Sequence, residues 1–158
     1  DKIQGAIVIS PFVDYADQLD GTKVMLSKVL GLALPWLSLP VEELPVENLM
    51  SDKEKQKEHD EDEFNLHYFT VGWARLSLNA QNRVKDTSPL VLAMPVLYII
   101  AENDKVSHVQ TVRKVGENIE QKDKTVVERK GELHEVLNET KRQETFKLIG
   151  EWISNRCD

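Results

Sequence analysis

The fold class is indicated most clearly by an apolar segment with a polar end, Pro95-Val96-Leu97-Tyr98-Ile99-Ile100-Ala101-Glu102-Asn103-Asp104. Its first seven residues are apolar or aromatic and rich in β-branched side chains, a pattern that predicts a strand. The polar residues at 102–105 end the strand in a turn. We therefore expect a loop that carries Asp104 at the end of this strand.

A regular alternation of elements follows this strand. Ser107 stands where a helix cap is expected, and helical spacing follows in Val109, Val112, Val115 and Ile119. A second strand is predicted at 125–128, before Lys130-Gly131. Thr140 and Gln143 have capping-box spacing, and a last helix is predicted with one apolar face that carries Phe146, Ile149, Trp152 and Ile153. Strand, helix, strand, helix is typical of parallel βα units.

Upstream, residues 3–9 form a continuous β-branched run that predicts a buried strand, with a parallel sheet as its context. The region between the first two strands is less regular, with an apolar stretch at 24–39 and a charged one at 51–63. Helix-breaking prolines stand at Pro35, Pro40 and Pro45. We interpret the chain as a core strand (1–13), a helical cap or lid insertion of short helices without sheet (14–90, "the cap"), and further core strands and helices (91–158).

The composition excludes several classes of protein. The chain has 158 residues, a formal net charge of −7 and 41% hydrophobic residues, which suits one soluble globular domain. The acidic balance argues against nucleic acid as a partner. The single cysteine, Cys157, allows no internal disulfide and argues against secretion, so we expect a cytoplasmic location. No phosphate-binding loop or dinucleotide fingerprint is present, and we expect no cofactor and no metal.

Two residues with catalytic chemistry follow strand ends. Asp104 comes three residues after one predicted strand, and His134 lies in the loop after the next. If the strands are parallel neighbours, both loops open at one edge of the sheet. A carboxylate can then orient the imidazole, which takes a proton from a nucleophile. The ordinary alternative is a turn-forming Asp and a loop His without function.

Several of these motifs resemble one family. The segment 95–107 resembles the acid-bearing strand and turn of α/β-hydrolases. The pattern Gly131-x-x-His134-Glu135-Val136-Leu137-x-Glu139 is similar to the histidine loop of the monoacylglycerol lipase and lysophospholipase branch, which is serine aminopeptidase S33-like. Segments 30–39 and 49–51 resemble parts of the lid region in that branch. The sequence departs from the pattern at Ala101, where the family usually has Gly, and near Glu63.

The resemblance implies an α/β fold, the C-terminal half of an α/β-hydrolase, with a mostly parallel sheet, flanking helices and an inserted helical cap. It assigns Asp104 as triad acid and His134 as triad base. The nucleophile of such enzymes sits in Gly-x-Ser-x-Gly, and none of the serines here has glycines on both sides at that spacing. We therefore expect an N-terminal half of the hydrolase, or a swapped copy, as partner. A relic without the nucleophile is the other interpretation.

The implied activity is hydrolysis of a lipid ester, most simply a monoacylglycerol or lysophospholipid. A serine peptidase, a short-ester esterase and a nucleophile-less lipid- or protein-binding module remain alternatives. The apolar stretch 24–39 suits peripheral contact with a membrane, or packing within the cap. His59 lies in a charged run and is interpreted as part of a solvated face. Trp36, Trp73 and Trp152 are predicted to be packing residues.

Overall fold

A three-stranded parallel sheet forms the centre of the computed structural model, which describes residues 3–17, 21–41 and 44–156. The sheet has the order β1 (Ala6–Ile9), β5 (Val96–Ala101) and β7 (Lys124–Arg129). All six residues of β5 are buried because it has a neighbour on each side. The three strands predicted from the sequence are confirmed, each with bounds that shift by at most a few residues; Cys157 lies outside the described residues.

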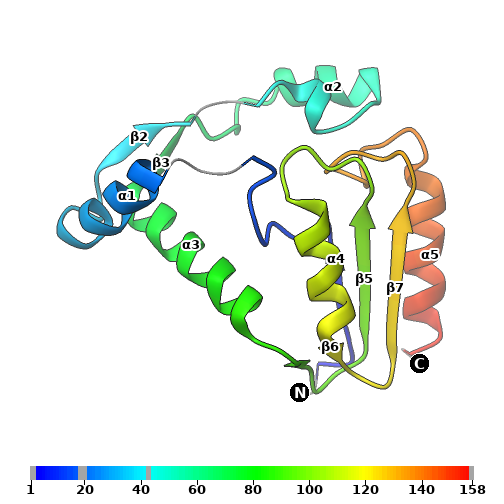
Figure 1. Ribbon diagram of the computed structural model, residues 1–158. Helices are drawn as coiled ribbons and strands as arrows, with labels where there is room; N and C mark the ends of the chain where they lie inside the picture. The colour runs from blue at the N-terminus through cyan, green and yellow to red at the C-terminus, as the bar shows by residue number, and fades with distance from the viewer. Residues whose placement is uncertain (1–2, 18–20, 42–43, 157–158) are drawn as a thin grey trace.

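Two helices cover the two faces of this sheet, α4 (Val109–Asn118) and α5 (Arg142–Ser154) (Figure 1). Side chains of a strand point alternately to opposite faces. The first face buries Val96, Tyr98 and Ile100 together with Val112, Val115 and Ile119. The second face buries Leu97, Ile99 and Ala101 together with Val136 and Trp152. The βαβα arrangement expected from the sequence is therefore a three-layer α/β fold.

The cap contains α1 (Gly21–Ala33), the short 3-10 helix η1 (Val46–Asn48), α2 (Lys53–Asp60) and α3 (Val71–Asp86), all between β1 and β5. Figure 1 shows α1 and α3 extending away from the sheet, while α2 lies above the ends of β5 and β7. The two long helices approach closely at glycines. A Cβ built at Gly31 in α1 would lie 2.7 Å from the Val71 carbonyl oxygen of α3, and one at Gly72 in α3 would lie 2.7 Å from that of Pro35, just after α1.

The expectation that the cap contains no sheet is wrong. β2 (Ser38–Pro40) pairs antiparallel with β3 (Tyr68–Thr70). These strands have three residues each, too short to show a two-residue periodicity in the sequence. A further short parallel pair, β4 (Leu90–Val91) with β6 (Ile119–Glu120), also escapes the pattern because each strand has only two residues.

Both predicted helix caps are also wrong. Helix α4 begins one residue later than a Ser107 cap requires, with His108 at the capping position and no side-chain hydrogen bond. The Ser107 hydroxyl donates instead to the Pro11 carbonyl at 3.4 Å. Helix α5 has Lys141 at its capping position, again without a side-chain hydrogen bond, so Thr140 does not form the expected capping box.

The predicted packing of the large apolar side chains is confirmed only in part. Trp152 is buried against the sheet, as expected. Trp36 and Trp73 in the cap are 70% and 56% exposed, so the prediction is wrong for these two. In α5, Phe146 and Ile153, which belong to the predicted apolar face, are also exposed, at 43% and 40%.

Candidate active site

Asp104 lies in the turn after β5, where its own carboxylate organises the backbone. Oδ1 accepts hydrogen bonds from the backbone N–H groups of Val106 and Ser107, both at 2.8 Å. The side chain is 2% exposed. Two bonds to one oxygen fix the orientation of the carboxylate and leave Oδ2 for another donor.

His134 supplies the group that faces Oδ2. It belongs to residues 130–141, which connect β7 to α5 and are called the histidine loop below. Its Nδ1 lies 2.8 Å from Oδ2 of Asp104. The expected contact between the two side chains is therefore confirmed, because β5 and β7 are parallel neighbours and their carboxyl ends meet at one edge. The catalytic role assigned to the pair stays a prediction.

This contact defines the proton positions on a neutral imidazole. A buried carboxylate accepts a hydrogen bond, so Nδ1 carries the proton and Nε2 keeps its lone pair. None of the described residues forms a hydrogen bond with Nε2. The His134 side chain is 21% exposed, which leaves the ring partly accessible. The arrangement can take a proton at Nε2 while Asp104 stabilises the imidazolium that results.

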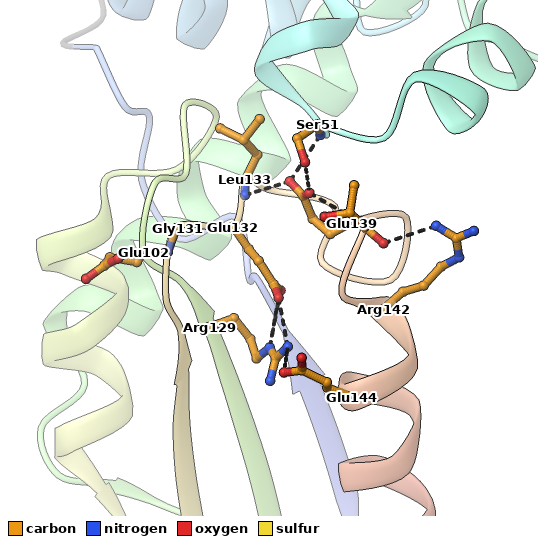
Figure 2. A network of polar contacts seen from close by, with 10 residues as sticks. Ser51, Glu102, Arg129, Gly131, Glu132, Leu133, Glu139, Arg142 and Glu144 are labelled. Carbon is orange, nitrogen blue, oxygen red and sulfur yellow. Dashed lines mark hydrogen bonds and ion pairs between the residues drawn. The ribbon is translucent and has the colours of Figure 1, made fainter.

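The start of the histidine loop is held by acidic and basic side chains (Figure 2). Gly131 adopts φ +75°, a left-handed conformation that favours glycine, and its N–H donates to Glu102 Oε2 at 2.8 Å. Nε and Nη2 of Arg129 both donate hydrogen bonds to the Glu132 carboxylate, with Nη2 2.8 Å from Oε1. These hydrogen bonds raise the pKa of the Arg129 guanidinium. Glu132 is 4% exposed, so Arg129 rather than solvent compensates its negative charge.

Two other groups at this site, Glu139 and Ser51, had no role predicted from the sequence. Glu139 is 2% exposed and bonded both to the histidine loop and to Ser51 of the cap. Glu139 stands inside the motif pattern of the histidine loop, and that position was its only signal. Ser51 is 88 positions away from Glu139, so no local pattern links them.

Ser10 is a further residue that the sequence did not single out. It follows β1 with φ +40°, is 6% exposed, and its hydroxyl has no hydrogen-bond partner among the described residues. A serine after a strand with positive φ resembles the local geometry of a nucleophile elbow. However, Val8 and Phe12 stand where an elbow has glycines, and the hydroxyl is buried. Ser10 therefore does not present an exposed nucleophile.

The remaining histidines lie in other contacts. His59 in α2 is 3.7 Å from the Asp60 carboxylate, on the charged segment of the cap. Nδ1 of His108 lies 2.8 Å from the Thr111 hydroxyl. Among the described residues, no group of three or more His, Cys, Asp or Glu side chains is placed to bind a metal. In the described ranges, no helix has the length and apolar character needed to cross a bilayer.

Comparisons with known proteins agree with this architecture. Residues 1–141 match the model of the family described as serine aminopeptidase, S33. A crystal structure of a monoacylglycerol lipase from Paleococcus ferrophilus matches with a TM-score of 0.89 and 26% identity, over 99% of this chain and 60% of that one. A monoglyceride lipase from Saccharomyces cerevisiae, solved with a substrate analogue, matches with a TM-score of 0.80 and 14% identity, over 97% of this chain and 56% of that one.

An uncharacterized abhydrolase domain-containing protein of Dictyostelium discoideum is 24% identical over 155 residues, which are 98% of this chain and 16% of that protein. This chain thus spans about a sixth of that curated relative and 60% of the Paleococcus lipase. The family match covers most of the chain, and the fold is shared with the matched structures over nearly its whole length. The chain belongs to the serine aminopeptidase S33 family and has the α/β-hydrolase fold.

Proposed function

We propose that this chain is the C-terminal half of a serine hydrolase that cleaves carboxylic esters of lipids, with a monoacylglycerol or lysophospholipid as substrate. The 2.8 Å contact between His134 Nδ1 and Asp104 Oδ2 carries the proposal. It supplies two members of a triad at the carboxyl edge of a parallel sheet, the place where ligands bind in such folds. The likeness to the Paleococcus monoacylglycerol lipase supports the choice of a lipid ester.

In the proposed mechanism, His134 handles the proton in both halves of the reaction. Nε2 takes the proton of a serine hydroxyl as that oxygen bonds to the ester carbonyl carbon. The imidazolium then gives the proton to the leaving alcohol, the C–O bond breaks, and an acyl-enzyme remains. In the second half Nε2 takes a proton from water, the hydroxide displaces the serine oxygen, and the proton returns to serine. Asp104 holds the ring in orientation and offsets its positive charge.

The serine and the oxyanion hole are proposed to come from an upstream half, or a swapped copy, that pairs with β1. Every parallel strand has two hydrogen-bonding edges, and β1 pairs only with β5 among the described residues. The free edge offers unpaired backbone groups. A further strand beside β1 would satisfy these backbone groups and would bring an elbow to the carboxyl edge.

The cap is proposed to handle the acyl chain and to touch a membrane surface through residues 24–39. Exposed apolar side chains gather there: Met25, Val29, Leu32, Leu34, Trp36, Leu37 and Leu39. Leu32 is 75% exposed, and helix α1 ends before Pro35, which gives an apolar helix followed by an apolar turn. Isolated exposed apolar residues are ordinary, but a large contiguous group marks an interaction surface.

Two other functions have a specific observation in their favour. The matched family takes its description from a serine aminopeptidase, which favours peptide bonds as substrate. The lack of a Gly-x-Ser-x-Gly elbow in these 158 residues favours a binding module. A panel of a long-chain monoacylglycerol, a lysophospholipid, a short ester and an aminoacyl amide separates them. We expect the completed enzyme to cleave the first two fastest. Faster cleavage of the amide would support the peptidase, and no cleavage of any substrate would support the binding module.

A further inference from the structure

The carboxylate of Glu139 lies between the cap and the histidine loop. Oε1 accepts hydrogen bonds from the backbone N–H groups of Leu133 at 3.0 Å and Ser51 at 3.2 Å. Oε2 accepts from the Ser51 hydroxyl. Figure 2 shows the carboxylate pointing between the two segments. A buried carboxylate is costly without donors, so the segments that supply the donors are held to it.

The same part of the cap contacts the histidine loop and the start of α5 at two further points. The Glu135 N–H donates to the Leu49 carbonyl at 2.9 Å. Arg142 Nη1 donates to Asp52 Oδ2 at 2.5 Å. Residues 49–52 lead directly into α2, whose first turn Asp52 caps. A displacement of this end of the cap therefore breaks bonds to the segment that carries His134.

Leu133 is the residue before His134, and its N–H depends on Glu139. We propose that Glu139 is a positioning residue, which fixes the backbone beside His134 and the entry to α2 in one arrangement. The site that it serves rests on the proposed function, but the coupling of the two segments does not. A misplacement of about 1 Å at a catalytic group costs on the order of 10²-fold in rate, so a residue that fixes the base acts on turnover.

The hydrogen-bond pattern separates geometry from charge as the source of this effect. In Glu139→Gln, one amide oxygen can still accept from both N–H groups, and the amide NH₂ can donate to the Ser51 hydroxyl. In Glu139→Asp, the charge remains but the side chain is shorter by one methylene and cannot reach Leu133 and Ser51 together. Ser51→Ala removes only the hydroxyl contact on the cap side.

The test on the full chain measures amide hydrogen exchange at Leu133 and Ser51, and the ring signals of His134, by NMR. We expect E139D and E139A to speed exchange at both amides by about tenfold or more and to shift the His134 signals. We expect E139Q to stay within about threefold of the unsubstituted chain. S51A should leave the Leu133 amide protected. Glu151→Gln, an exposed change on α5 in an i,i+4 pair, is the control.

In the completed hydrolase, the same variants should separate kcat from KM. We expect E139D to lower kcat by about 10²-fold while E139Q keeps most of it, and S51A to raise KM more than it lowers kcat. A loss in E139Q that is larger than the loss in E139D would overturn the proposal in favour of a charge effect. Unchanged Leu133 exchange in E139D would overturn it outright. Since exchange needs no turnover, an inactive hydrolase with the expected exchange pattern counts only against the proposed function. If E139A does not fold, the comparison of E139Q with E139D still tests the proposal.

Discussion

His134 Nδ1 lies 2.8 Å from Asp104 Oδ2, although the two residues are 30 positions apart in the sequence. The carboxylate is fixed from behind by two backbone N–H groups, those of Val106 and Ser107. The imidazole is fixed through its own loop. Both side chains are therefore oriented before a substrate binds, and a general base that is already oriented transfers a proton more effectively.

The first prediction concerns this pair in the completed hydrolase. His134→Ala should lower kcat/KM by several orders of magnitude because no other group takes the proton. Asp104→Asn should lower it by about 10⁴-fold, since the amide favours the wrong imidazole tautomer. Steady-state hydrolysis of a monoacylglycerol measures both. His59→Ala is the matched control, because His59 lies in α2 beside Asp60, and its rate should stay within about twofold. Wild-type turnover in His134→Ala would remove His134 from the mechanism.

A second prediction concerns acid. The hydrogen bond from Arg142 makes the largest contribution to lowering the pKa of Asp52, and backbone N–H bonds from the first turn of α2 lower it further. A carboxyl whose pKa is lower in the folded than in the unfolded chain stabilises the fold at a pH above its unfolded-state pKa, which is near 4. This stabilisation is lost as the pH falls through the folded-state pKa. The contact between α2 and α5 should therefore weaken below about pH 4. NMR titration of the Asp52 carboxyl and of the Glu54 and Lys55 amides measures this.

Asp52→Asn is the control for that titration. Asn still caps a helix but carries no charge, so the acid transition should disappear while α2 remains capped at neutral pH. An acid transition of the same size in Asp52→Asn would assign it to another group.

The third prediction concerns the packing of α1 on α3. Gly31→Ala places a methyl group 2.7 Å from the Val71 carbonyl oxygen and from the Arg75 Cβ. One of the helices must move, and we expect a loss of about 1–3 kcal/mol in the free energy of unfolding. Gly150→Ala in α5 is the control, since nothing lies within 4 Å of its added Cβ. That change should stabilise the chain by about 0.5–1 kcal/mol. Urea denaturation of both variants measures the difference, and a stable Gly31→Ala would mean that the helices are not in close contact.

The sequence predicts those elements of the fold in which an apolar run or a helical periodicity extends over many residues. The strands at β1, β5 and β7 and the helix at α4 are apolar or periodic over enough residues to be recognised. Asp104 and His134 could be placed because parallel strands bring their carboxyl ends together. The contact distance follows from the structure alone.

The rest depends on contacts between residues distant in the sequence. β2 pairs with β3 across about thirty residues, and Ser51 meets Glu139 across 88. Ser107 fails as a cap because Pro11, 96 positions away, accepts its hydroxyl hydrogen. Trp36 and Trp73 were predicted to pack, since side chains of this size usually do, yet they are exposed. Local propensity cannot report any of these relationships.

We propose that this chain supplies an acid and a base, but no nucleophile. The most direct measurement treats the chain alone, and the chain joined to an upstream segment with a Gly-x-Ser-x-Gly elbow, with a fluorophosphonate that labels activated serines. Monoacylglycerol hydrolysis is assayed in parallel. We predict no labelling and near-background hydrolysis for the chain alone. Labelling of the upstream serine should appear with activity in the joined protein, and both should be lost in His134→Ala. Labelling of Ser10 in the chain alone, abolished by Ser10→Ala together with hydrolysis, would show instead that this chain carries its own nucleophile.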